Sequence, residues 1–261
     1  MNFALRLRRR CWIIPVIAAS VVAVMGIEPS NAQTGRTDLP RSTQETMSEY
    51  QRLIKDGARF NATGDFQSAE AAYRRAVILC QSHYGENASV CGNAVIRLGL
   101  EISNQGRFED ADRIFGAANN LAQRSASPFA IPRYLIYRAM DMSNRDEFDR
   151  ARRLVLAANK RYSVLLKTEV ATDRFQDENA KERVNSILLE FAHGLYVHAG
   201  IAQRVGRKNE AILSLKLAKD VAAKIPGAPQ AYLDDLDKVL RSPPPPRPQI
   251  SEQPEEELNS E

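Results

Sequence analysis

The sequence predicts an all-α protein of about four helical hairpins, followed by one C-terminal capping helix. Small and large apolar residues recur at helical spacing in four similar phrases, and each phrase follows a turn. The composition agrees, because 13 glycines and 7% aromatic residues among 261 positions disfavour a turn-rich β-sandwich or barrel. A single hairpin cannot bury its apolar stripe alone, so we expect the hairpins to stack.

The second helix of each hairpin is predicted by a turn followed by alanine, a large residue and a second alanine on one helix face. The alanines allow a neighbouring helix to approach closely, and the large residue fills the space between them. The four copies are Gly64-Asp65-Phe66 with Ala69, Tyr73 and Ala76; Gly106-Arg107-Phe108 with Ala111, Phe115 and Ala118; Asp146-Glu147-Phe148 with Ala151, Val155 and Ala158; and Gly206-Arg207-Lys208 with Ala211, Leu215 and Ala218.

The first helix of each hairpin is predicted by a pattern that precedes the turn by about seven residues. This pattern again lies on one helix face and has a small residue at the crossing point. Its four copies are Leu53, Gly57 and Phe60; Val95, Gly99 and Ile102; Leu135, Ala139 and Met142; and Leu195, Ala199 and Ala202.

Together these positions resemble the signature of the tetratricopeptide repeat. That signature has a large, a small and an aromatic residue in the first helix, then alanine, an aromatic residue and alanine in the second. The first hairpin meets every position, the second meets most, and the third and fourth are more degenerate. The resemblance covers roughly residues 45–225. It implies a right-handed α-solenoid, with residues 42–241 as the repeat domain.

The turns are spaced more widely than in the common 34-residue repeat. They step by 42 residues from Gly64 to Gly106, by 40 to Asp146 and by 60 to Gly206. Longer helices, as in the repeat class typified by kinesin light chain, explain the first two steps. The third step contains an extra stretch, Arg161–Val184, which we interpret as two helix extensions that meet near Thr172–Gln176.

Both edges of the repeat domain carry helix signals. Ser42-Thr43-Gln44-Glu45 is a capping box that opens the first helix. Before this capping box we expect a disordered linker at 33–41. After the repeat domain we expect a disordered, proline-rich and acidic tail at 242–261. An amphipathic helix that covers the last open face is predicted by the spacing of Tyr232, Leu233, Leu236, Val239 and Leu240.

The N-terminus has the features of a secretory signal peptide. A basic segment, Arg6–Arg10, precedes the apolar run Cys11–Ile27, and Ser30 and Ala32 fit a cleavage site after Ala32. We therefore interpret residues 1–32 as a signal peptide, with retention as a membrane anchor as the alternative. Both interpretations place the remaining chain outside the cytoplasm, so we expect a periplasmic or secreted protein without membrane contact after cleavage.

The charge balance disfavours a nucleic-acid partner. Removal of residues 1–32 leaves 36 − 4 = 32 basic and 32 − 1 = 31 acidic residues, a net charge of +1. A nucleic-acid-binding protein usually carries a basic surface, and this body is balanced.

Two cysteines remain after the signal segment. Cys80 ends one predicted helix and Cys91 begins the next, on either side of the short segment His83–Asn87. Because an oxidising compartment would join cysteines brought together by this turn, we predict a Cys80–Cys91 disulfide. Two buried free thiols are the alternative.

The sequence contains no nucleophile elbow, phosphate loop, HExxH helix, CxxC pair or calcium loop. Glu190 and His193 have the Glu-x-x-His spacing of bundle metal sites, but no second copy completes such a site. We interpret His83, His193 and His198 as structural or surface residues. No enzymatic activity, metal or cofactor is therefore expected.

The resemblance implies that first-helix positions line a concave groove. Apolar side chains alternate there with amides, which suits an extended or helical peptide. A carboxylate clamp is not expected, because Ile54 and Ala58 replace its lysine and asparagine. Alternatively, Ile54, Ile96 and Ile136 pack between neighbouring hairpins. The groove positions are Gln51, Ile54, Ala58, Asn61, Asn93, Ile96, Leu100, Asn104, Arg133, Ile136, Met140 and Asn144, with His193, Tyr196 and Gln203 from the fourth hairpin.

These features lead us to expect a non-catalytic, exported scaffold or adaptor that binds a protein or peptide segment, in a bacterial envelope complex. Two alternatives remain at this point. One is an enzyme or small-ligand binder that uses the irregular region near residues 160–185. The other is a membrane-anchored assembly factor, if the N-terminal segment is retained.

Overall fold

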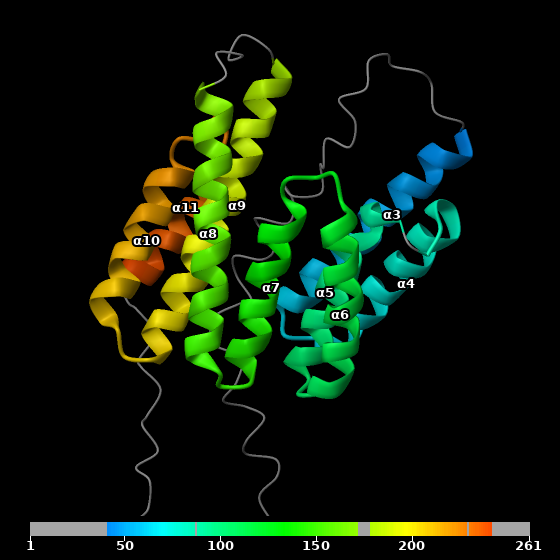
Figure 1. Cartoon of the computed structure of the whole chain (residues 1–261), viewed down its shortest axis with the longest axis horizontal. Coiled ribbons are helices and arrows are strands. Elements are labelled where there is room, and N and C mark those ends of the chain that lie inside the picture. Colours follow the sequence, from blue (N-terminus) through cyan, green and yellow to red (C-terminus); the bar gives the residue numbers. More distant parts are fainter. Residues whose placement is uncertain (1–40, 87, 172–177, 229, 242–261) are drawn as a thin grey trace, which may run out of the picture.

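The computed structural model describes residues 41–86, 88–171, 178–228 and 230–241, and this part of the chain is helical without a β-strand (Figure 1). The all-α prediction is thus confirmed for the described residues. The predicted signal peptide, the tail at 242–261 and the linker, apart from Arg41, lie outside them. The helices are α3 (Arg41–Ala62), α4 (Phe66–Tyr84), η1 (Ser89–Cys91), α5 (Gly92–Asn104), α6 (Phe108–Arg124), α7 (Ala130–Asn144), α8 (Phe148–Ala171), α9 (Glu178–Arg204), α10 (Lys208–Ala222) and α11 (Gln230–Arg241).

Four turns of the same geometry join α3 to α4, α5 to α6, α7 to α8 and α9 to α10. In each turn, one residue adopts a left-handed conformation: Gly64, Gly106 and Gly206 with φ of 78°, 79° and 76°, and Asp146 with φ of 66°. The next residue donates its N–H to a carbonyl five residues earlier, for example Asp65 to Phe60 at 3.0 Å. Glycine adopts this conformation without strain, and aspartate tolerates it better than most residues.

Within each pair, the small residues allow the two helices to cross closely. All eight alanines of the second-helix pattern are buried, as are Tyr73, Phe115, Val155 and Leu215. A Cβ atom built on Gly57 would lie 2.6 Å from the Tyr73 ring, and one on Gly99 would lie 3.2 Å from the Phe115 ring. The large residue of the second helix therefore packs directly against the backbone of the first.

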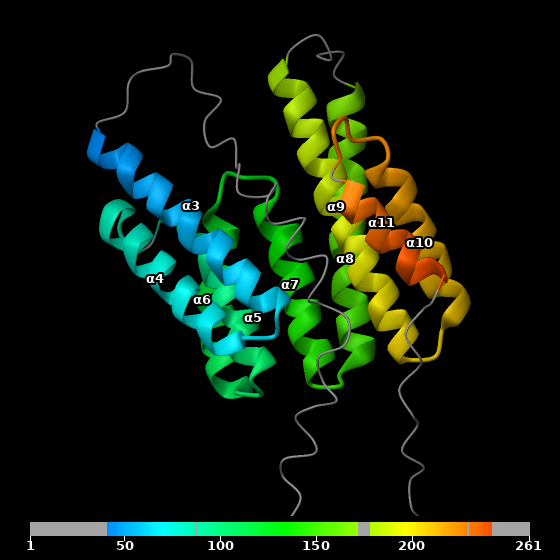
Figure 2. The same ribbon diagram turned by 180° about the vertical axis from the view of Figure 1, so that it is seen from behind.

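The helix pairs follow one another across the molecule, from α3 and α4 at one edge to α10 and α11 at the other (Figures 1 and 2). α4 packs on α5, α6 on α7, and α8 on α9, while α5 also contacts α7 and α7 contacts α9. One apolar cluster extends from α3 into α9, and a second joins α9, α10 and α11. The predicted stacking of helical hairpins is confirmed.

The wide third step of the sequence pattern corresponds to two long helices. α8 has 24 residues and α9 has 27, against 13 to 22 for the helices of the preceding pairs. The two helix extensions are therefore present, and their predicted meeting point near Thr172–Gln176 lies outside the described residues. α11 packs on α10 and buries Leu236, so the predicted capping helix is also observed.

Polar contacts between successive pairs repeat at equivalent positions. Glu70 and Asp112 each lie six residues after their turn glycine. Glu70 accepts hydrogen bonds from Gln105 at 2.7 Å and Arg107 at 2.8 Å, and Asp112 accepts one from Arg145 at 2.9 Å. Gln105 and Arg145 occupy the same place in their respective turns. Each acid thus links the second helix of one pair to the turn of the next.

A disulfide joins Cys80 at the end of α4 to Cys91 in η1, with 5.7 Å between their Cα atoms. Both residues are buried. The bond connects the first helix pair to the second, as the sequence predicted.

Substitution of Gly57 by alanine tests the close crossing. The new methyl group would meet the buried Tyr73 ring, so we expect overpacking to lower the free energy of unfolding by about 1–2 kcal/mol. Gly116 in α6 is the matched control, because a Cβ atom added there would have no neighbouring atom within 4 Å. Gly116→Ala should instead stabilise by about 0.5–1 kcal/mol through helix propensity. Urea denaturation measures both, and equal effects of the two substitutions would contradict the packing.

Loss of the disulfide should also destabilise the fold. The bond closes a short loop, since its cysteines are 11 positions apart. We expect the Cys80→Ser/Cys91→Ser variant to lose about 2–3 kcal/mol of unfolding free energy. Thermal denaturation of the variant and of the reduced wild type should agree. An unchanged melting temperature in both would contradict a structural role for the bond.

Candidate binding site

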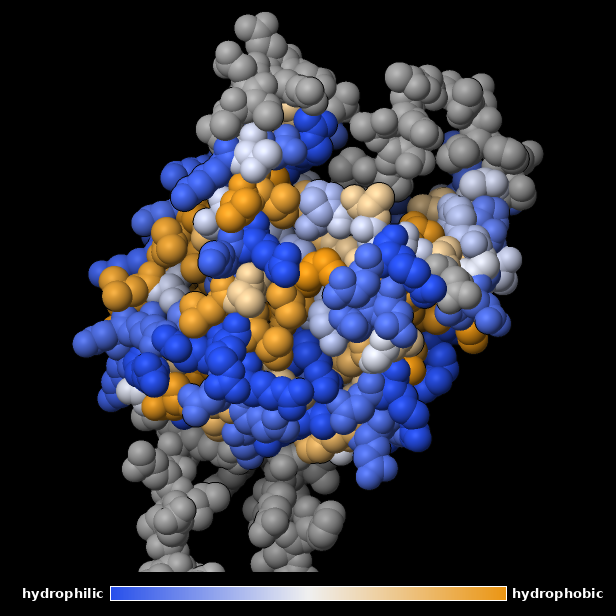
Figure 3. Space-filling model, viewed as in Figure 1, coloured by the Kyte–Doolittle hydropathy of each residue, from blue (hydrophilic) through white to orange (hydrophobic). Residues whose placement is uncertain are grey.

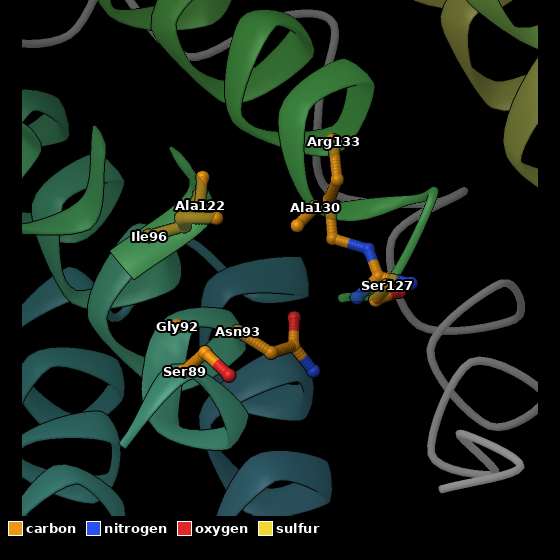
Figure 4. Close-up of a pocket in the computed structure, with 8 residues that line it drawn as sticks. All are labelled: Ser89, Gly92, Asn93, Ile96, Ala122, Ser127, Ala130 and Arg133. Atoms are coloured by element: carbon orange, nitrogen blue, oxygen red, sulfur yellow. The ribbon is translucent and has the colours of Figure 1, made fainter. Parts of the chain in front are cut away.

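A small cavity lies between the first turns of α5 and α7 (Figure 4). Its volume is about 20 Å³, room for about one water molecule. In Figure 4 the Asn93 amide and the Ser89 hydroxyl point into the space between the two helices. The cavity brings together three residues predicted from the sequence, Asn93, Ile96 and Arg133. The full lining is Ser89, Gly92, Asn93, Ile96, Ala122, Ser127, Ala130 and Arg133.

Arg133 is held by the buried Glu190 of α9, which Tyr162 of α8 also contacts. Its Nε and Nη2 atoms donate to Glu190 Oε1 at 2.9 and 2.6 Å, and the Tyr162 hydroxyl donates to Glu190 Oε2 at 2.8 Å. Burial alone would raise the pKa of Glu190, but Arg133 and Tyr162 outweigh it and lower that pKa below its ordinary value. The guanidinium is therefore oriented and largely neutralised inside the protein.

Asn93 is oriented by a second buried arginine. Arg97 donates through Nε to Asn93 Oδ1 at 3.2 Å, and its guanidinium lies 6.0 Å from the Tyr73 ring and 5.5 Å from the Tyr137 ring. Within the described part of the chain, the Asn93 Nδ2 donors have no hydrogen-bond acceptor. They are thus available to a carbonyl oxygen that reaches the cavity.

The other predicted asparagines form a polar ladder near the ends of the first helices. Asn61 Nδ2 donates to both carboxylate oxygens of Glu101 at 2.9 Å, and Asn104 Nδ2 donates to Oε2 at 3.2 Å. Asn144 Nδ2 donates in turn to Asn104 Oδ1 at 2.9 Å and to Ser103 Oγ at 3.1 Å. The ladder connects α3, α5 and α7, so these amides stabilise the stack of helix pairs from within.

Glu101 is the centre of this ladder and is almost completely buried. Burial raises the pKa of Glu101 to about 7, against the opposing effect of the Asn61 and Asn104 amides and of Arg97. The carboxylate therefore changes its protonation near neutral pH, where an exposed glutamate is ionised.

The aliphatic residues expected to line the groove lie in the core instead. Their exposed fractions are 6% or less, and they belong to the apolar cluster that joins the first three helix pairs. For Ile54, Ile96 and Ile136 this burial agrees with the alternative interpretation, packing between neighbouring hairpins, although Ile96 also lines the cavity. The full set of these aliphatic residues is Ile54, Ala58, Ile96, Leu100, Ile136 and Met140.

The remaining predicted positions are not brought together with the cavity lining. Gln51 is exposed on α3, whereas Tyr196 and Gln203 are buried. His193 is partly buried in α9, and this burial lowers its pKa to about 4. Of the expected groove positions, Asn93, Ile96 and Arg133 line this cavity.

The described residues offer neither a metal site nor a membrane span. No group of three or more histidine, cysteine, aspartate or glutamate side chains among them is arranged to hold a metal ion. No helix among them is both long and apolar enough to cross a membrane.

Comparison with protein-family models and with curated proteins finds no match. Function is therefore inferred from the residues and their arrangement.

Sequence reasoning missed Arg97 and Glu101, which control the orientation of Asn93 and Asn61. A signal for both was present, since they are the two charged residues in the otherwise uncharged first helix of the second hairpin. A charge in such a place requires a buried partner. Which residue supplies that partner depends on how the pairs stack, which the sequence pattern does not specify.

The raised pKa of Glu101 predicts a specific pH dependence of stability. A folded-state pKa above the ordinary 4.5 means that the folded protein binds the proton more tightly than the unfolded chain. The protonated Glu101 carboxyl makes its full contribution to the free energy of unfolding below pH 4.5. This contribution is lost as the pH rises to about 7 and the carboxyl ionises. Glu101→Gln should therefore gain stability relative to wild type over this interval, by roughly 1–3 kcal/mol.

Urea denaturation of both proteins at several pH values measures this difference. The effects of the titratable groups that both proteins share cancel in it. Glu109→Gln, at an exposed position of α6, is the control and should follow the wild type throughout. A constant difference between Glu101→Gln and wild type would contradict the raised pKa.

Proposed function

We propose that the chain is a non-catalytic scaffold of the tetratricopeptide-repeat type that is exported and binds a protein segment. The proposed solenoid is right-handed and contains about four repeats. Support comes from the four turns of equal geometry and from the small-to-large crossings within the helix pairs. The buried Cys80–Cys91 disulfide is compatible with export into an oxidising compartment, and a bacterial periplasm fits the N-terminal sequence.

The observation that carries the proposal is the cavity between α5 and α7. It lies where two neighbouring first helices begin, and the free Nδ2 donors of Asn93 point into it. A space for about one small group suits the tip of a partner side chain or a backbone carbonyl. A partner segment would extend from this anchor over adjacent surface, and its carbonyl oxygen would accept a hydrogen bond from Asn93.

The fixed orientation of Asn93 and Arg133 supports recognition of a partner without catalysis. Arg97 fixes the Asn93 amide, and Glu190 fixes Arg133 from the interior. Preorganised donors lose little conformational entropy when a partner binds. Because the Arg133 charge is already paired, we expect a neutral polar or apolar segment to be preferred over an acidic one at this cavity.

The substitution Asn93→Arg tests this proposal. The larger side chain would fill the cavity and remove the free amide donor, so we expect capture of the native partner to fall at least tenfold. Crosslinking in the native envelope, followed by mass spectrometry, identifies and quantifies the captured proteins.

Asn120→Arg is the matched control, because it makes the same change at an exposed position of α6 outside the cavity lining. It should leave capture unchanged. Identical partner sets for wild type and Asn93→Arg, with equal melting temperatures, would exclude the cavity as the binding site.

A further inference from the structure

A second surface, separate from the cavity, extends along the exposed side of α8. Eight exposed residues follow one another at helical spacing, and four of them are cations. No carboxylate lies on this face between its ends, and the exposed Asp149 precedes it by one turn. The face consists of Arg153, Leu156, Ala157, Lys160, Arg161, Val164, Lys167 and Thr168.

The neighbouring helix α10 extends this surface with two leucines. Leu213 and Leu217 are 67% and 46% exposed, on one side of α10 together with Lys216. α8 and α10 both pack on α9, and Arg152 of α8 pairs with Glu210 of α10 at 2.7 Å near the start of each helix. Figure 3 shows hydrophobic side chains among hydrophilic ones over α8 and α10. We call these α8 and α10 residues the basic-apolar face.

The apolar side chains of this face are unusually exposed to solvent. Besides the two leucines, Val164 is 54% and Leu156 is 38% exposed. Four of the seven large apolar residues exposed in the described part of the chain thus belong to it. The other three are Ile78, Tyr84 and Val205.

The cations of the face are not neutralised by direct contacts, although the exposed Asp220 lies one turn after Lys216 on α10. Arg153, Lys160, Arg161, Lys167 and Lys216 form no ion pair within the described part of the chain. The chain after residue 32 carries a net charge of only +1, so this concentration of cations is a local feature. Attraction to a negatively charged partner is the direct consequence.

We propose that the basic-apolar face binds the surface of an anionic lipid bilayer. Long lysine and arginine side chains extend to headgroup phosphates while nearby leucine and valine side chains enter the interface. Three of the five cations are lysines, which protein–protein interfaces disfavour and anionic membranes attract. Peripheral binding of this kind needs no membrane-spanning helix.

Lysine protection in the full chain tests the proposal at the face itself. Amine labelling followed by mass spectrometry compares Lys160, Lys167 and Lys216 with Lys55, an exposed lysine of α3. Vesicles of mixed phosphatidylglycerol and phosphatidylcholine should protect the three face lysines and leave Lys55 reactive. Phosphatidylcholine vesicles or high salt should remove the protection, because the attraction is electrostatic.

Two matched variants distinguish binding through this face from a general effect of positive charge on the protein. Arg153→Gln/Lys160→Gln/Arg161→Gln should weaken protection of Lys167 and Lys216 by about a hundredfold in lipid concentration, since each cation contributes about 1 kcal/mol. Arg52→Gln/Arg59→Gln/Arg75→Gln removes the same charge from exposed positions of α3 and α4, keeps Lys55 as the reference, and should change nothing. Leu213→Ser/Leu217→Ser should weaken the protection as well.

The proposal is overturned by equal protection of Lys55 and the face lysines, or by no protection with anionic vesicles. Protection by a polyglutamate peptide but not by vesicles would also overturn it and would assign the face to an acidic protein segment. Because these lysines lie outside the cavity, neither result depends on whether Asn93 binds a partner.

Discussion

The close crossing of the two helices in each pair is the constraint on which the rest of the structure depends. Gly57 has no space for a methyl group beside Tyr73, and Gly99 has little beside Phe115. This contact fixes the angle and distance within a pair. It leaves an apolar face on each pair, and only the next pair can cover that face. The stack, its capping helix and the two apolar clusters follow from this one requirement.

The same requirement explains why the predicted groove is mostly closed. Ile54, Ile96 and Ile136 stand on the first helices, where stacking turns them toward the neighbouring pair. The buried or half-buried polar residues on these helices bond to one another, and Asn61 and Asn104 both donate to the buried Glu101. A cavity is present where α5 and α7 begin, and Asn93 and Arg133 are part of its lining.

The sequence was sufficient to predict the helices, the four turns, the disulfide and the capping helix. These features are local, since each depends on residue type at short spacing, such as glycine before a helix or alanine at a crossing. The sequence was not sufficient to predict which of the groove positions are exposed. The burial of Leu100 and the pairing of Arg133 with Glu190 depend on contacts between residues far apart in the chain. The ladder around Glu101 was missed for the same reason.

Native-state hydrogen exchange by helix tests the central claim most directly. In a stack where each pair is stabilised by its neighbours, a helix covered on both sides should open least often. The account predicts the slowest exchange in α5 and α7, which contact each other and the helices on either side, and faster exchange in α3 and α11 at the edges. Exchange in α5 as fast as in α3 would contradict a fold held together by stacking of successive helix pairs.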